Sequence, residues 1–276
     1  MFQVRQPFAA GIYYNLDPEQ LKMQIANTYY HNLGPKKIKT EKSFGVIVPH
    51  DKIALSGHIS SWAYSKLEKA NYVLLGANHS QIGEKFAIVR EGLWKTPLGE
   101  ISISKDVAEK IIAKSKILEF DVTAHEKEHS LEVQLPFLQH RFGNDFKIVP
   151  IVITNSFLDQ DFVEMCRQIG KAIASVIKNE KEKWLIIATT NLTEGTKDLV
   201  NKNDKKILSA IKSFDAEKIF KKIRNLKFCG YGAVLAAVEA AKDLGAKTCK
   251  FLKYSNSFEI LKNQDDVTGY AAFLLS

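Results

Sequence analysis

The chain has 276 residues, of which 45% are hydrophobic and 25% charged, the composition of a globular protein long enough to bury a large core. No apolar run approaches the roughly 20 residues that span a bilayer, and the N-terminus lacks the apolar core of a secretory signal. We therefore expect a cytoplasmic protein with no membrane partner. Three cysteines, an odd and sparse set, argue against a disulfide framework.

The net charge of +8 arises from 39 basic and 31 acidic residues, a balance that raises the question of nucleic-acid binding. The lysines are scattered along predicted helix faces and loops, however, and no nucleic-acid motif accompanies them. We expect a lysine-rich, mixed-charge surface and no nucleic-acid partner.

Short apolar runs alternate with segments of helical periodicity along the whole chain. Strands are predicted at 44–48, 72–76, 146–153, 184–188, 247–254 and 270–275, with a hairpin-like region at 86–103. Helices are predicted at 17–33, from the turn at Ser56-Gly57 through 67, at 106–114, 130–142, 159–177, 203–214, 216–223 and 233–244.

Most of these strands are continuously apolar rather than alternating, which indicates that helices cover both faces of the sheet. Alternation of such strands with helices predicts an α/β fold, a three-layer α/β/α sandwich with a largely parallel or mixed central sheet. No linker or repeat interrupts the pattern, so we predict a single domain over residues 1–276.

The segment from Glu126 to Leu138 combines acidic residues and a histidine with an apolar helical stripe. Ser130 is predicted to be the N-cap of this helix, with glutamates near its positive end, and Pro136 is predicted to kink it. Two interpretations are open: a capped surface helix with solvated acids, or a helix start directed at a functional site.

Functional groups in open α/β sheets gather beyond the carboxyl ends of the strands. Here the first strand leads to His50, the second to His79, and the fourth to Asn191 and Glu194. Cys229 lies beside two glycines just before a helix, where the helix dipole favours a thiolate. Two imidazoles and a thiolate suit iron, copper or zinc.

Each of these residues also has a purely structural interpretation. A strand-end histidine can simply close a turn, His129 can hydrogen-bond within its own helix start, and a free cysteine is most often a small buried hydrophobe. The aromatic residues Tyr13 and Tyr14 and the segment 94–100 can wall a pocket or pack in the core, and for the tyrosines we expect the core.

The chain contains a series of motifs in this order: Pro49-His50, Ser56-Gly57, Leu75-Gly76-Ala77-Asn78-His79, Thr96-Pro97-Leu98-Gly99-Glu100 and residues 128–137. In sequence and order they resemble the Memo family, the mediators of cell motility, with further likeness at 5–14 and 269–272. The stretches at 96–99 and 128–132 are the most specific. The resemblance covers essentially the whole chain.

The resemblance implies a fold similar to the class III extradiol dioxygenases, which hold non-haem Fe²⁺ with two histidines and a carboxylate. The Memo pocket offers two histidines and a cysteine instead, which by position correspond to His50, His79 and Cys229. An iron or copper site is therefore implied. The resemblance settles no activity, because members are linked to redox chemistry, to motility signalling and to phosphopeptide binding.

Two departures from the family pattern affect this pocket. The usual Ser-Ser-Asp-x-x-His strand exit reads Thr-Thr-Asn-Leu-Thr-Glu here, so that Asn191 replaces the aspartate and Glu194 the histidine. The usual His-Ala-Gly-Tyr reads His-Asp-Lys-Ile at residues 50–53. Either Glu194 serves as a carboxylate ligand, as in a facial triad, or the pocket has lost its ancestral chemistry.

Three functions follow as hypotheses. The first is a metal-dependent oxidoreductase in which His129, Glu194 or Glu128 acts as acid, base or support for the metal ligands. The second is a non-catalytic protein that binds a small molecule or a peptide in the same pocket. The third is a hydrolase with Cys229 as nucleophile and His79 as base.

Overall fold

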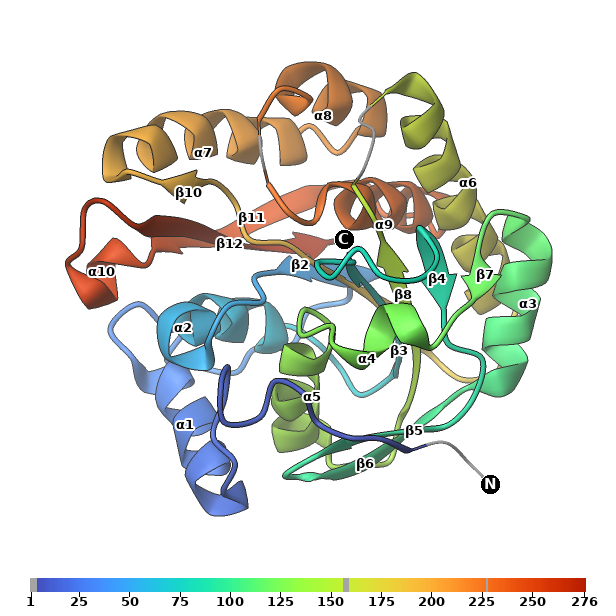
Figure 1. The fold of residues 1–276 in the computed structure, drawn as a ribbon, viewed down its shortest axis with the longest axis horizontal. Helices are drawn as coiled ribbons and strands as arrows, with labels where there is room; N and C mark the ends of the chain where they lie inside the picture. Colours follow the sequence, from blue (N-terminus) through green and yellow to red (C-terminus); the bar gives the residue numbers. More distant parts are fainter. Residues whose placement is uncertain (1–3, 156–158, 227) are drawn as a thin grey trace.

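The computed structural model describes residues 4–155, 159–226 and 228–276 and has three layers, with helices on both faces of one large sheet (Figure 1). Twelve strands form this sheet within the described residues. They are β1 (Val4–Arg5), β2 (Gly45–Val48), β3 (Asn71–Ala77), β4 (Phe86–Ile88), β5 (Leu93–Thr96), β6 (Gly99–Ile103), β7 (Glu119–Phe120), β8 (Lys147–Ile153), β9 (Trp184–Thr189), β10 (Glu194–Gly195), β11 (Cys249–Asn256) and β12 (Val267–Leu275).

The helices alternate with these strands along the chain. They are α1 (Pro18–Tyr30), α2 (Ile53–Tyr64), α3 (Lys105–Ser115), α4 (Thr123–Glu126), α5 (Leu135–Phe142), α6 (Gln160–Ile177), α7 (Lys197–Ile211), α8 (Ala216–Ile223), α9 (Tyr231–Asp243) and α10 (Phe258–Leu261), together with the 3₁₀ helix η1 (Glu132–Gln134).

The sheet is mixed, with a parallel centre. Strands β6, β8, β3, β9 and β2 lie side by side and parallel, while β12 pairs antiparallel with β2 and with β11. The hairpin β5–β6 and strand β1 extend the other edge. The predicted three-layer α/β/α sandwich with a largely parallel or mixed sheet is therefore confirmed, whereas the domain bounds 1–276 stay a prediction.

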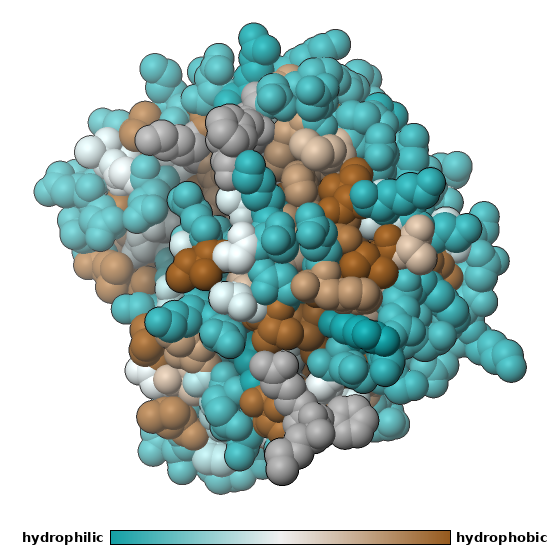
Figure 2. Space-filling model, turned by 45° about the vertical axis from the view of Figure 1, so that its right-hand side comes forward, coloured by the Kyte–Doolittle hydropathy of each residue, from teal (hydrophilic) through white to brown (hydrophobic). Residues whose placement is uncertain are grey.

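Successive strand residues point to opposite faces of the sheet and therefore pack into two separate hydrophobic cores. Val73 and Leu75 face the core under α3, α6, α7, α8 and α9, whereas Tyr72 and Leu74 face the core under α1, α2 and α5. Both faces are buried, which explains why these strands are apolar without alternation. On the face shown in Figure 2, hydrophilic side chains dominate, and hydrophobic ones reach the surface in scattered groups.

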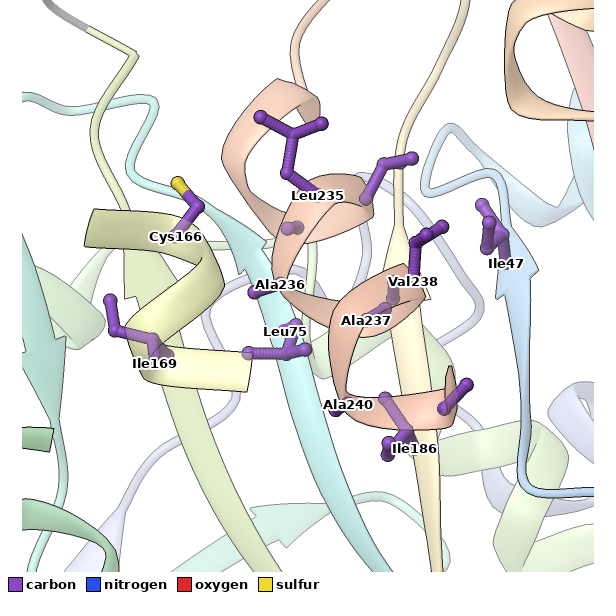
Figure 3. Packing of buried hydrophobic residues seen from close by; sticks show 14 of the residues in the cluster. Ile47, Leu75, Cys166, Ile169, Ile186, Leu235, Ala236, Ala237, Val238 and Ala240 are labelled. Atoms are coloured by element: carbon purple, nitrogen blue, oxygen red, sulfur yellow. The ribbon is translucent and has the colours of Figure 1, made fainter. Parts of the chain in front are cut away.

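Helix α9 is buried on nearly all sides and packs closely against α6 (Figure 3). Its small residues Ala236 and Ala240 meet α6 at Gly170, where an added Cβ would lie 2.5 Å from the Ala236 carbonyl oxygen. This close packing fixes the start of α9, and therefore Cys229, relative to the sheet.

Three sequence predictions at helix starts are wrong. Residues Ser56 and Gly57 lie inside α2, which begins at Ile53. The segment after Ser130 begins as the 3₁₀ helix η1, and Pro136 lies in the first turn of α5, where its missing N–H costs nothing, rather than kinking a longer helix. Helix α7, predicted to begin at residue 203, begins at Lys197. The first two turns bury only Val200 and the charged Asp204, so the apolar stripe that predicts a helix does not extend over them.

None of the helices in the described ranges combines the length and apolar character that a membrane crossing requires.

We predict that Gly170→Ala destabilises the protein, although the same change in an open helix is stabilising by roughly 1 kcal/mol. The new methyl group must displace the backbone of α9 at Ala236, so the free energy of unfolding should fall by about 1–3 kcal/mol. Urea denaturation measures this change, with the exposed neighbour Lys171→Ala as a control expected within about 0.5 kcal/mol of wild type. A stabilised Gly170→Ala variant would contradict the packing.

Candidate metal centre

The carboxyl ends of the parallel strands β2, β3 and β9 meet at one edge of the sheet and open into a pocket of about 1020 Å³. His50 follows β2, His79 follows β3 and Asn191 follows β9, and all three line this pocket. Cys229 and His129 reach the same pocket from the start of α9 and from the loop between α4 and η1.

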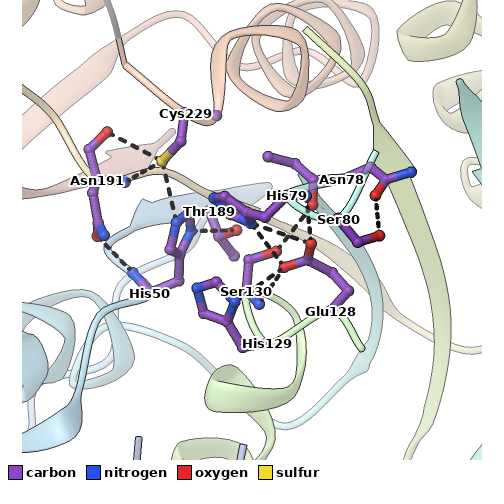
Figure 4. A network of polar contacts seen from close by, with 12 residues as sticks. His50, Asn78, His79, Ser80, Glu128, His129, Ser130, Thr189, Asn191 and Cys229 are labelled. Carbon is purple, nitrogen blue, oxygen red and sulfur yellow. Dashed lines mark hydrogen bonds and ion pairs between the residues drawn. The ribbon is translucent and has the colours of Figure 1, made fainter. Parts of the chain in front are cut away.

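Three imidazoles converge in the pocket (Figure 4). One ring nitrogen from each of His50, His79 and His129 lies within 4.8 Å of those of the other two. The ring centroids of His50 and His79 are 5.0 Å apart, and those of His79 and His129 are 4.7 Å apart. This spacing allows all three rings to donate to one metal ion.

Cys229 lies on the opposite side of His50 from His129 (Figure 4). Its Sγ is 3.1 Å from His50 Nε2 and accepts a hydrogen bond from the backbone N–H of Asn191 at 3.3 Å. The structure thus brings together His50, His79 and Cys229, the residues that the sequence nominates as ligands. It also places His129 where it can compete with the thiol as third ligand.

His50 is held in place by β9. Its backbone N–H donates to Asn191 Oδ1 at 3.1 Å, and its Nδ1 lies 3.1 Å from the hydroxyl of Thr189. Burial, and then the charges of His79 and His129, lower the pKa of His50 well below its usual value. The imidazole is therefore neutral, the form that binds a metal, with Nε2 facing Cys229 and the pocket.

His79 is backed by the fully buried carboxylate of Glu128. That carboxylate accepts from His79 Nδ1 at 3.0 Å and from the His79 backbone N–H at 2.8 Å. A carboxylate behind the outer nitrogen of a histidine is the usual support of a metal-binding imidazole, because it fixes the ring and raises its basicity.

The His79–Glu128 pair stabilises positive charge at the metal-facing side of the pocket. Burial opposes ionisation of both groups. The pKa of His79 is nevertheless raised to about 10 by hydrogen bonds with Cys229 and Glu128, and the pKa of Glu128 is lowered to about 2 by its bond to His79. The protonated His79 carries one proton on Nδ1, bonded to Glu128, and one on Nε2. A metal cation would replace the proton on Nε2, so the donor set fits a metal ion.

His129 stacks on the ring of Tyr13, with centroids 4.2 Å apart and an interplanar angle of 19°. Burial lowers the pKa of His129 to about 4, with Glu128 partly opposing the shift. At neutral pH the ring is therefore unprotonated and can accept a proton or donate to a metal. Tyr13 lines the pocket, whereas Tyr14 lies in the core as expected.

The two residues that replace the family's usual aspartate and histidine after β9 have different places in the pocket. Asn191 ties His50 to Cys229 through its side-chain oxygen and its backbone N–H. Glu194 lies exposed on β10 at the pocket wall, and within the described residues no hydrogen bond or ion pair joins it to the histidines. Its predicted roles as ligand or acid stay predictions.

A family model described as "Memo-like protein" matches residues 5–274. The chain belongs to the Memo family. A MEMO1 family protein of Methanosarcina barkeri is 34% identical, with the alignment covering 99% of this chain and all of that protein. One of Methanococcus vannielii is 36% identical over 99% of both chains.

The fold of this Memo-family protein is also similar to the crystal structure of an uncharacterized protein from Escherichia coli K12. The TM-score is 0.51 at 12% identity, and the match covers 83% of this chain and 99% of that one. At this identity the likeness concerns the fold alone.

The pocket of this chain depends on a buried ion pair that the sequence did not reveal. Arg5 Nη1 lies 2.5 Å from Glu132 Oε2, and the same guanidinium donates to the carbonyl oxygens of His125 and Glu128, each at 2.8 Å. Glu132 also accepts from the backbone N–H of Ala9 at 2.8 Å. The bonds to two loop carbonyls fix the segment that carries Glu128 and His129. Because Glu128 and Glu132 are fully buried, the interpretation of this segment as a surface helix with solvated acids is wrong for these two residues.

We predict that Glu132→Gln lowers the free energy of unfolding by about 3–5 kcal/mol, because it leaves the Arg5 guanidinium buried without its counter-charge. Urea denaturation measures the loss. Glu126→Gln, an exposed acid in the same segment, is the matched control and should stay within about 0.5 kcal/mol of wild type. Equal effects of the two substitutions would contradict a structural role for the ion pair.

Proposed function

We propose that the protein is a metal-dependent redox protein that holds one non-haem iron (Fe²⁺) or copper ion in this pocket. His50 and His79 are the first two ligands, and Cys229 is the third, as the family resemblance implies. Two observations support the proposal: the ring nitrogens of His50, His79 and His129 lie within 4.8 Å of one another, and Cys229 Sγ lies 3.1 Å from His50 Nε2. Imidazole and thiolate together suit iron and copper.

A bound iron or copper ion supplies Lewis acidity and one-electron redox chemistry. The chain's own residues orient and support it. Glu128 holds His79 through Nδ1, and Thr189 holds His50, so that both rings keep a fixed direction toward the pocket. His129, stacked on Tyr13 at the pocket wall, is the group placed to accept a proton from a hydroxyl group of a bound small molecule.

Glu128 supports His79 rather than acting as an acid or base, because it has no exposed surface through which to reach a substrate. Glu194 contributes to the wall of the pocket. This assignment leaves His129 as the acid–base group among the three candidates predicted from the sequence.

A non-catalytic binding protein is the second candidate function. The pocket volume of about 1020 Å³ far exceeds the space needed for a metal ion and suits a small molecule or a short peptide. Binding of such a ligand that survives metal removal, without oxygen consumption, would favour this function over the redox one. Neither function involves a nucleic acid or a membrane.

We predict near-stoichiometric iron or copper in protein purified without chelators or an affinity metal, measured by mass spectrometry. His50→Ala and His79→Ala should each lose most of it, because each removes one donor and leaves too few to retain the ion. His140→Gln is the matched control, since this exposed histidine lies on α5 and outside the pocket. Wild-type protein that contains no metal as purified and does not bind added Fe²⁺ or copper would refute the redox function.

The third ligand can be identified with Co²⁺-substituted protein. With Cys229 as ligand, we predict a thiolate-to-cobalt charge-transfer band in the near-ultraviolet spectrum that Cys229→Ser abolishes and His129→Gln retains. Absence of the band in the wild type, together with cobalt loss in His129→Gln, would instead assign the third position to His129.

A further inference from the structure

Asp51 is a carboxylate that lines the pocket and has no role in the proposed metal site. It follows His50 directly and lines the same pocket as His129. It shares the lining of this pocket with the stacked rings of Tyr13 and His129. The family resemblance gives it no role, because the usual residue at this position is alanine.

The Asp51 carboxylate is held in a fixed orientation from behind. Its Oδ2 accepts from the hydroxyl of Tyr270 at 2.6 Å, and its Oδ1 accepts from the backbone N–H of Lys52 at 2.6 Å. Tyr270 is fully buried in β12, so the tyrosine hydroxyl is a rigid donor. Each oxygen keeps a further lone pair for a ligand.

The rest of the pocket wall is also acidic, in contrast to the protein's net charge of +8. Among the described lining residues, Glu194 and Asp266 join Asp51 as acids. The cations are the guanidinium of Arg224 and the imidazolium of His79, whose charge the buried carboxylate of Glu128 balances. The aromatic rings of Tyr13 and Phe228 line it as well, and aromatic faces attract cations.

We propose that Asp51, oriented by Tyr270, selects ligands that carry an ammonium group. A carboxylate with spare lone pairs beside an aromatic ring recognises an amine by a charge-assisted hydrogen bond and a cation–π contact. This inference rests on the proposed use of the pocket for a ligand beside the metal, but it does not require that the ligand react.

The test uses three catechols that differ in the charge of one side chain. Dopamine carries an ammonium group, 4-ethylcatechol carries no charge, and 3,4-dihydroxyphenylacetate carries a carboxylate. Anaerobic calorimetric titrations give the Kd of each, on protein as purified and after treatment with EDTA. Comparison between probes on one protein sample cancels differences in the folded fraction.

Dopamine should bind roughly ten- to a hundredfold more tightly than 4-ethylcatechol, as for one hydrogen bond between charged groups. Asp51→Asn should remove this preference. Tyr270→Phe should reduce it, because the ring stays while the hydroxyl that orients Oδ2 is lost. Asp265→Asn removes the same charge outside the pocket and should leave the preference unchanged.

Equal binding of dopamine and 4-ethylcatechol, tightest binding of the carboxylate probe, or no binding of dopamine at millimolar concentration would each overturn the inference. So would an undiminished preference in Asp51→Asn. Wild-type protein that contains no metal as purified, takes up no added Fe²⁺ or copper and still prefers dopamine would refute the metal proposal alone. Metal-containing protein without the preference would refute only the role of Asp51.

Discussion

The ion pair between Arg5 and Glu132 is the constraint on which the arrangement of the pocket depends. A carboxylate without any exposed surface must find full compensation inside the protein, and Glu132 finds it in the N-terminal segment. The hydroxyl of Tyr14 donates to Glu132 at 2.5 Å, and Arg5 also packs over the ring of Trp94 at 4.3 Å. These contacts hold the N-terminal segment against the loop that supplies Glu128 and His129. In this position Tyr13 stacks on His129.

Different structural elements hold the pocket residues in position. The parallel strands fix His50, His79 and Asn191 at one edge of the sheet, and the packing of α9 on α6 fixes Cys229. Those four residues directly flank a strand or helix, whereas Glu128 and His129 lie in the loop between α4 and η1, which the Arg5–Glu132 pair holds in place. A site whose donor groups rest on rigid elements is preorganised, so little conformational entropy is lost when a cation binds.

The sequence predicts the features of this fold that follow from local pattern. Continuous apolar runs predicted the central strands because both sheet faces are buried, and strand ends pointed to His50, His79 and Asn191 because parallel strands end together. The sequence could not reveal partners that lie far apart in the chain. Arg5 and Glu132 are 127 residues apart, and Asp51 and Tyr270 are 219 apart. No local sequence pattern can predict contacts over such separations. For the same reason, local pattern suggested that Glu128 and Glu132 were solvated.

The contrast between the surface charge and the pocket charge shows why net charge is a poor guide to the ligand. Exposed lysines give the chain its excess of positive charge, but their field is screened beyond about 8 Å at physiological ionic strength. Inside the pocket the nearest groups are Asp51, the His79–Glu128 pair and the acidic wall, and in a partly buried environment these act at lower dielectric and with less screening. On the proposed use of the pocket, we therefore expect these local charges to select the ion and the ligand, and the lysines to affect only what approaches the protein from a distance.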